Sequence, residues 1–263
     1  MPELPDVQVF QQYLEQNALR QRVRDVELSA AGMLSGASSK ALKAKLKDRE
    51  LVATRRHGKN LFVRVSGDDW LLLHFGMTGE LKYFEDTESM PKYTRLRLDF
   101  ANGRHLAYVN MRRLGKIGLV NDVDAFIAEQ KLGPDALDLD LAGFRRALGG
   151  RRGKIKATLM DQTVIAGIGN IYADEVLFAA GVDPRARTEK LSGATVSGLH
   201  TAMRAVLRKA IDADADANKL PRSFLLPHRA RGGTCPKCDG TLQQVKLGGR
   251  MTYFCPRDQR KKA

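Results

Sequence analysis

The sequence predicts an α+β protein of several domains. Three observations support this prediction: short β-like segments fill residues 22–121, helical periodicity runs through residues 154–213, and all three cysteines fall within the last 29 residues. The first region indicates an N-terminal antiparallel β-sandwich with flanking helices, the second a helical domain, and the third a C-terminal zinc-ribbon-like β-hairpin. We place these domains at residues 1–132, 151–222 and 228–263, with a linker at 133–150.

The N-terminal domain is predicted to begin with a helix. Apolar side chains recur at helical spacing between residues 3 and 20, at Leu4, Val7, Phe10, Tyr13 and Leu14. Such a helix places Pro2 and Glu3 at its N-terminal end, where proline is tolerated. A second, short helix is expected at residues 38–48, with Ser38 or Ser39 as its N-cap.

Eight further segments of this domain have the composition of β-strands. Turn residues separate them at the spacing expected of an antiparallel sandwich or barrel. They lie at residues 22–29, 50–58, 60–66, 69–76, 79–84, 94–100, 104–110 and 116–121.

A change of composition marks the end of the β region. Residues 132–143 are rich in Gly, Pro and Asp, which is typical of a linker. Helical periodicity follows at 154–161, 170–181 and 195–213, and Gly181 is placed to end the second of these helices. Residues 213–223 are predicted to be a second linker before the cysteine region.

The charge of the chain indicates a polyanionic partner. Forty-four Lys and Arg residues against thirty Asp and Glu residues give a formal charge of +14, which most often reflects nucleic-acid binding. We find neither an uninterrupted run of eighteen apolar residues nor a basic-then-apolar leader, so we expect no membrane partner and a cytoplasmic location.

The cysteine spacing predicts a metal site. Cys235-Pro-Lys-Cys238 is followed, after sixteen residues, by Cys255-Pro-Arg-Asp258. Two such knuckles form a four-ligand zinc ribbon, and a carboxylate oxygen can replace the fourth thiolate. We predict one structural Zn²⁺ held by Cys235, Cys238, Cys255 and Asp258, with His228 as an alternative to Asp258. A hairpin that has lost its metal is the competing interpretation. Arg250 lies at the predicted hairpin tip and suits a phosphate contact, or is a solvated charge.

The N-terminal residues Pro2 and Glu3 have catalytic potential. Removal of Met1 would leave Pro2 with a secondary α-amine, a group with a pKa of ~7.7–8.0 that is partly unprotonated near neutrality. Such an amine attacks carbonyl-like carbon and forms a charged iminium. Glu3 beside it is a proton donor or acceptor. The alternative is a frayed terminus with an ordinary proline before a helix.

Residues 165–172 form a glycine-containing turn between two predicted helices. Gly167 and Gly169 permit a tight turn, and Asn170 then opens a helix whose N–H groups attract a phosphate. The alternative is a glycine-mediated helix contact with Asn170 as a plain N-cap. A dinucleotide-binding turn is excluded because a helix, not a strand, precedes the motif.

Together these motifs identify a family. Pro2-Glu3-Leu4-Pro5, the stretch IAGIGNIYADEVLFAAGVDP at residues 165–184 and the cysteine-bearing hairpin occur in one order. They resemble the bifunctional DNA glycosylase/AP lyases of the formamidopyrimidine-DNA glycosylase and endonuclease VIII family, over nearly the whole chain. PELP and HFGMTG (74–79) favour the formamidopyrimidine branch. The resemblance implies a helix-two-turn-helix domain at residues 151–222 and structural zinc.

The resemblance also implies an activity. A monomer would bind double-stranded DNA that contains a damaged base or an abasic site, in a cytoplasmic, nucleoid-associated setting. It would excise oxidised bases, with 8-oxoguanine and formamidopyrimidines favoured, and cleave the abasic strand by β,δ-elimination through a Pro2 Schiff base. Alternatives are endonuclease VIII-like specificity for oxidised pyrimidines, a catalytically silent damaged-DNA-binding protein, or an RNA-binding protein that shares one element.

Individual roles carry over position by position. Pro2 is the implied nucleophile, Glu3 the proton shuttle and Lys59 a catalytic-site lysine at a phosphate. The other implied DNA-binding residues are His74, Asn170 and Arg250 at phosphates, Lys156 near the lesion, and Met77, Arg112 and Leu114 as residues that fill the space left by the everted base. Considered separately, Met77 and Leu114 suit a core, and Lys59 suits a solvated strand.

Three departures from the family pattern affect the implied specificity. Asp6 replaces a glutamate, Leu114 replaces an aromatic wedge, and residues 219–234 are shorter than the lesion-capping loop region of the best-known members. A leucine stacks less well than an aromatic ring, so we expect the opposite-base preference to be relaxed or shifted.

Overall fold

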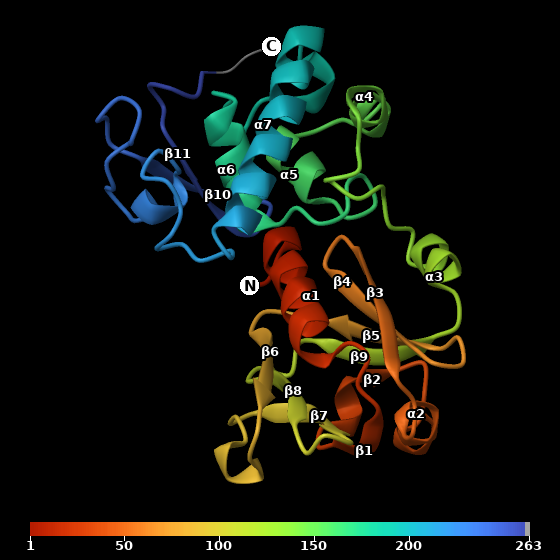
Figure 1. Ribbon diagram of the computed structural model, residues 1–263. Coiled ribbons are helices and arrows are strands. Elements are labelled where there is room, and N and C mark those ends of the chain that lie inside the picture. The colour runs from red at the N-terminus through yellow and green to blue at the C-terminus, as the bar shows by residue number, and fades with distance from the viewer. Residues whose placement is uncertain (261–263) are drawn as a thin grey trace. The chain divides into compact units, whose positions relative to one another are not determined.

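The structure, a computed structural model, describes residues 1–260 (Figure 1). This part of the chain divides into two compact units. Unit 1 contains Met1–Pro2 and Asp6–Gln130, and unit 2 contains Glu3–Pro5 and the described chain from Lys131 onward. Helix α1 (Leu4–Ala18) therefore has its first two residues in unit 2 and the rest in unit 1.

Unit 1 is built from two β-sheets with short flanking helices. Its remaining helices are α2 (Ser39–Leu46) and α3 (Val123–Glu129). Its strands are β1 (Val23–Leu28), β2 (Leu34–Ser35), β3 (Leu51–His57), β4 (Asn60–Val65), β5 (Trp70–His74), β6 (Gly79–Phe84), β7 (Thr94–Phe100), β8 (His105–Asn110) and β9 (Lys116–Val120).

Within residues 1–130 the strand order is β1-β7-β8-β6 in one sheet and β2-β9-β5-β4-β3 in the other. Neighbouring strands are antiparallel except for the short parallel pair of β2 with β9. The eight predicted strands are all present, and the predicted fold class is confirmed. The prediction omitted β2, which is only two residues long and makes its pairing far along the chain.

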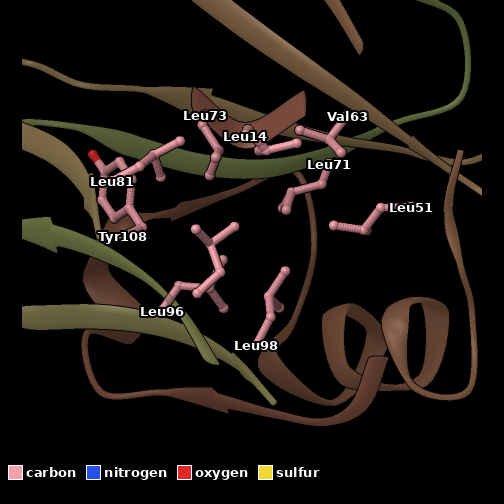
Figure 2. A pocket seen from close by; sticks show the side chains of 10 residues that line it. Leu14, Leu51, Val63, Leu71, Leu73, Leu81, Leu96, Leu98 and Tyr108 are labelled. Atoms are coloured by element: carbon pink, nitrogen blue, oxygen red, sulfur yellow. The ribbon is translucent and has the colours of Figure 1, made fainter. Parts of the chain in front are cut away.

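The core of unit 1 lies where leucines of the two sheets meet. Figure 2 shows Leu71 and Leu73 of β5 directed toward Leu96 and Leu98 of β7. Leu14 of α1 joins them, and a cavity of about 10 Å³ remains at their centre. An apolar space of this size stays dry because a water molecule there would have too few polar partners. Burying a leucine stabilises a fold by roughly 1.5–3 kcal/mol, so Leu14 fastens α1 to the sandwich.

Unit 2 contains the helical part and the C-terminal hairpin. Its helices are α4 (Leu141–Leu148), α5 (Ile155–Met160), α6 (Asn170–Ala179) and α7 (Gly193–Asp212), and its described strands are β10 (Gln243–Leu247) and β11 (Arg250–Phe254). The β10–β11 pair is antiparallel. Leu4, Tyr172 and Leu207 are buried in one shared core.

The segment predicted as a linker, residues 133–150, is largely structured. It contains helix α4, for which the Asp140 side chain accepts a hydrogen bond from Gly143 N at 2.6 Å. Phe144 and Leu148 of this helix are buried in the core of unit 2. The abundance of Gly and Asp obscured a capped helix in which one face is apolar. Helix α3, which Asp122 caps, was also missed because it is only seven residues long.

Candidate functional site

Glu3 lies at the start of helix α6, within unit 2. Its side chain is fully buried, and its carboxylate accepts hydrogen bonds from the backbone N–H groups of Gly169 (2.7 Å), Ile171 (2.8 Å) and Tyr172 (3.1 Å). The first N–H groups of a helix lack partners inside the helix and lie at the positive end of its dipole, so a carboxylate is stabilised there. The sequence predicted a phosphate at these N–H groups, whereas the structure places Glu3 on them.

Two glycines permit this close approach. A Cβ at Gly169 would lie 2.4 Å from the carboxyl carbon of Glu3. Gly167 has a φ of +114°, and its carbonyl accepts a hydrogen bond from Leu4 N at 3.0 Å. Gly169, rather than Asn170, is the N-cap residue of α6. The glycine spacing therefore serves to anchor the chain at Glu3 and Leu4.

Pro2 immediately precedes this anchored segment. It is half-buried, and Met1 before it is 40% exposed. While Met1 is present, the Pro2 nitrogen belongs to a peptide bond and has no basic lone pair. The predicted nucleophile therefore depends on the removal of Met1.

Lys156 of helix α5 lies in the interior of unit 2. It is 1% exposed, and its Nζ atom lies 2.8 Å from Asn170 Oδ1, 2.7 Å from Thr252 Oγ1 and 2.6 Å from Asp174 Oδ1. Burial lowers the pKa of Lys156, and the adjacent Asp174 opposes this shift. The sequence predicted a DNA contact for Lys156, but in this structure protein oxygens surround its ammonium group.

The side chain of Asn170 is held by hydrogen bonds, whereas the side chain of Arg250 is exposed. The amide of Asn170 is held between Lys156 and the carbonyl of Met251, to which its Nδ2 donates at 3.1 Å. Arg250 is exposed at the first position of β11, directly after the tip glycines Gly248 and Gly249, which have positive φ angles. An exposed guanidinium at a hairpin tip suits a phosphate.

In unit 1, Lys59 and His74 lie at neighbouring strand ends. Lys59 is in the turn between β3 and β4, and Asn60, the next residue, pairs with His74 of β5. Desolvation, with smaller contributions from Lys59 and Lys116, lowers the pKa of His74 to about 4. His74 is therefore neutral near pH 7. Its Nδ1 accepts a hydrogen bond from Gly76 N at 3.3 Å, which leaves the proton on Nε2 for donation to a ligand.

Two loops of unit 1 hold the three predicted wedge residues. Met77 is half-buried in the loop after β5, and Arg112 and Leu114 are exposed in the loop after β8, with Leu114 51% exposed. Arg112 N donates to Thr78 Oγ1 at 3.1 Å, which links the two loops. None of the three belongs to the core, so the alternative prediction that Met77 and Leu114 are core residues is wrong.

The loop bases are fixed by buried polar groups. The Asn110 side chain donates to Phe75 O at 3.0 Å, and the Tyr108 hydroxyl donates to His74 O at 2.9 Å. A Cβ at Gly76, which has a φ of +60°, would lie 2.4 Å from the Leu114 backbone. The backbones of the two loops are therefore packed tightly, while their side chains remain outside.

The cysteines of the C-terminal hairpin form a metal-binding group. Among the described residues, the Sγ atoms of Cys235, Cys238 and Cys255 lie within 4.8 Å of one another. Tetrahedral zinc binds sulfur at about 2.3 Å and places two sulfurs roughly 3.8 Å apart, so these thiols fit the metal. The Asp258 carboxylate is outside this group, and its Oδ2 lies 3.4 Å from Lys237 Nζ. His228 Nε2 lies 2.9 Å from Arg222 O.

Comparison with known proteins assigns the chain. Family models match residues 1–117 (formamidopyrimidine-DNA glycosylase N-terminal domain), 132–221 (its H2TH domain) and 232–260 (a zinc finger found in FPG and IleRS). The formamidopyrimidine-DNA glycosylase of Halorhodospira halophila is 35% identical over 99% of this chain and 100% of that protein. The chain belongs to the formamidopyrimidine-DNA glycosylase family.

Further relatives agree with this assignment. The formamidopyrimidine-DNA glycosylase of Moorella thermoacetica is 35% identical, over 94% of this chain and 95% of that protein. The Lactococcus lactis formamidopyrimidine-DNA glycosylase, bound to DNA that contains an AP site, has a TM-score of 0.89 and 30% identity over 98% of this chain and 100% of that chain. MutM in complex with DNA that contains carbocyclic 8-oxo-G has a TM-score of 0.89 and 29% identity, and the match covers 99% of this chain and 100% of that chain.

The family membership confirms the predicted resemblance and the zinc-finger domain. No helix within residues 1–260 is both long and apolar enough to cross a bilayer. The sequence did not predict a role for Asp174, Arg229 or Thr252. Asp174 and Thr252 contact the ammonium group of Lys156, and Arg229 contacts Asp174. The one available signal was an acidic pair, Asp174-Glu175, inside an otherwise apolar helix.

Proposed function

We propose that this glycosylase excises oxidised bases from double-stranded DNA and cleaves the abasic strand with Pro2 as its nucleophile. The observation that carries the proposal is the anchoring of Glu3 on the N-terminus of α6, by three N–H groups, directly beside Pro2 in the chain. The buried carboxylate holds Glu3 in place, and Pro2 is attached to Glu3 by a peptide bond. A nucleophilic terminus needs a fixed position because catalysis depends on orientation.

The chemistry follows from a processed Pro2. Its nitrogen lone pair forms a bond to C1′ while the bond from C1′ to the base breaks, and the base leaves with that electron pair and takes up a proton. The Pro2 nitrogen then loses its proton, and its lone pair forms the C=N⁺ double bond of an iminium while the C1′–O4′ bond breaks. O4′ leaves with the electron pair of that bond and takes up a proton. Loss of a C2′ proton then breaks the C3′–O bond, and a second elimination breaks the C5′–O bond. We assign the proton transfer at ring opening to Glu3.

Lys59, His74, Asn170 and Arg250 are proposed to hold the phosphates around the everted nucleotide. Lys59 and Arg250 supply charge, whereas His74 supplies a neutral N–H because its pKa is about 4. The net charge of +14 adds a long-range attraction that salt weakens. Met77, Arg112 and Leu114 are proposed to fill the vacated space, which offsets the few kcal/mol that unstacking a base costs.

Oxidised purines are the proposed lesions. PELP and HFGMTG support this assignment, and crystallised relatives were bound to DNA with carbocyclic 8-oxo-G and Fapy-dG. The protein is proposed to act as a monomer in the cytoplasm, at the nucleoid. A panel of duplexes that carry single oxidised purines or pyrimidines tests the assignment, with base release and strand cleavage measured separately. Equal rates on damaged and undamaged duplexes would contradict it.

Zinc is proposed to be bound by Cys235, Cys238 and Cys255, with Asp258 as fourth ligand after its carboxylate leaves Lys237. Metal analysis of the purified Asp258→Ala protein tests the fourth ligand. We expect a reduced zinc content, and full content would exclude Asp258.

A further inference from the structure

We propose that Lys156, Asp174 and Arg229 form an internal charge cluster that positions Asn170 and the β10–β11 hairpin for phosphate binding without contacting DNA themselves. This inference rests on the proposed function. It concerns residues of unit 2 alone, all of which the structure describes.

Lys156 sets the orientation of the Asn170 side-chain amide. An ammonium group can only donate, so the amide atom 2.8 Å from Lys156 Nζ must be the oxygen. The nitrogen therefore faces Met251 O, to which it donates one proton at 3.1 Å. An amide nitrogen has a second proton, and this proton is the one that a DNA phosphate would accept. Lys156 thus determines which end of Asn170 meets the ligand.

The same charge cluster holds strand β11 by hydrogen bonds. Asp174 Oδ2 accepts hydrogen bonds from Arg229 Nη2 at 2.9 Å and from Tyr253 N at 3.1 Å. Arg229 Nη2 also lies 3.3 Å from Met251 O, and its guanidinium stacks over the Tyr253 ring at 4.9 Å. Lys156 reaches Thr252 Oγ1. The residues at positions 251–253, directly after Arg250, are therefore each bonded to the cluster.

The stability of the fold does not by itself require charged groups at this position. Asp174 and Lys156 are each 1% exposed. Apolar residues of the same volume often stabilise a fold as well as a buried ion pair does. What the charged groups add is a fixed orientation of their hydrogen-bonding partners. Here those partners are the Asn170 amide and the strand that begins with Arg250.

Binding to a duplex with a tetrahydrofuran abasic analogue tests the inference. The variants are Lys156→Met, Asn170→Ala and the double variant, with Lys209→Met, an exposed lysine of α7, as matched control. If Lys156 acts through Asn170 and Thr252 and not on DNA, each single variant binds at least tenfold more weakly, and the loss in the double variant is several-fold smaller than the product of the two single losses. Lys209→Met binds within about twofold of the wild-type protein.

A direct phosphate contact by Lys156 would give a different pattern. The losses in the double variant would multiply, and the salt dependence of binding would fall by about one phosphate in Lys156→Met. Either result overturns the inference. At saturating damaged duplex, the single-turnover excision rate of Lys156→Met should stay within about threefold of wild type, because positioning acts on binding.

A second variant guards against misfolding, since removing Lys156 leaves Asp174 Oδ1 buried without its lysine partner. Lys156→Met/Asp174→Asn removes both charges, and we expect it to fold and still bind at least tenfold more weakly. Wild-type affinity in this variant overturns the inference, and so does loss of fold in both variants, which would make the cluster a folding requirement. If the wild-type protein itself does not prefer the abasic duplex over an undamaged one, the proposed function fails instead.

Discussion

The first turn of α6 and the exposed loops of unit 1 use polar groups in opposite ways. At α6, Glu3, Lys156 and Asp174 are buried, and their charges are paired with protein atoms. In the loop at residues 111–114, Arg112 N donates to Thr78 Oγ1, while the apolar side chain of Leu114 is 51% exposed. The α6 region satisfies its groups internally, and the loop presents side chains that the protein itself does not cover.

This difference separates residues that set geometry from residues that meet the ligand. Substitutions at the α6 region should change stability and function together because each buried charge depends on its partners. Substitutions in the exposed loops should change DNA binding alone because few protein contacts are lost.

The largest effect is expected from Gly169→Ala. The added Cβ would lie 2.4 Å from the Glu3 carboxyl carbon, so Glu3 must leave the helix N-terminus. Overpacking and loss of a cap each cost about 1–2 kcal/mol, and we expect at least a hundredfold loss of base excision. Denaturant unfolding and single-turnover excision measure the two effects.

Gly193→Ala is the matched control for this substitution. Gly193 lies at the first position of α7, and a Cβ there meets no atom within 4 Å. Alanine in a compatible backbone stabilises by about 0.4–1 kcal/mol. If both variants behave alike, the close approach of Glu3 to Gly169 is not important for function.

Glu175 gives the α6 region a pH-dependent stability. Burial raises the pKa of Glu175 from 4.5 to about 7, although Leu225 N and Leu226 N donate to its carboxylate. The folded state therefore binds this proton more tightly than the unfolded state. The contribution to stability is complete below pH 4.5 and is lost as the pH rises to about 7. At about 1.4 kcal/mol per pKa unit, the loss is on the order of 3 kcal/mol.

Glu175→Gln tests this prediction, since glutamine does not titrate. The free energy of unfolding of wild-type protein should fall relative to that of the variant between pH 4.5 and 7, as measured by denaturant unfolding at a series of pH values. The zinc ligands are present in both proteins, so their titration cancels in the difference. Parallel curves would show that Glu175 has an ordinary pKa.

Arg250 combines both types of behaviour, with an anchored backbone and an exposed side chain. Arg250→Ala should lower the affinity for damaged and undamaged duplexes by a similar factor and reduce the salt dependence by about one phosphate. Fluorescence anisotropy at several salt concentrations measures both. An unchanged salt dependence of the affinity would show that the hairpin is not part of the DNA interface.

The smallest effect on stability is expected for Leu114→Ala. Half of this side chain is already in solvent, so we expect a change in unfolding free energy within about 0.5 kcal/mol and a several-fold loss of affinity for a damaged duplex. Met90→Ala, at a site 44% exposed, is the control and should leave binding unchanged. A drop in melting temperature of several degrees for Leu114→Ala would show that the loop is part of the packed structure.

Local patterns were sufficient to predict the strands of the sandwich. The segment NLFVRV pairs with WLLLH, and both strands lie within two residues of their predicted bounds. Helix α4 was detectable from its Asp140 cap, yet the nearby Gly, Pro and Asp residues suggested a linker instead. Helix α3 has an Asp122 cap as well, but at seven residues it was too short for its helical periodicity to be recognised.

The arrangement around α6 was not predictable from local patterns. Glu3 reaches Gly169 across 166 positions of the chain, and no local rule pairs residues at that separation. The family resemblance presented Lys156 as a DNA contact near the lesion, and buried lysines are rare. Only the fold reveals that Asp174, Asn170 and Thr252 meet its ammonium group.

The most direct test of the catalytic proposal is borohydride trapping on an abasic duplex, followed by mass spectrometry of the cross-linked peptide. With Met1 removed, we predict that the sugar fragment is attached to the nitrogen of Pro2, and that protein which retains Met1 forms no adduct. An adduct on Lys59 or another lysine, or equal trapping with Met1 in place, would contradict the assignment of Pro2 as the nucleophile.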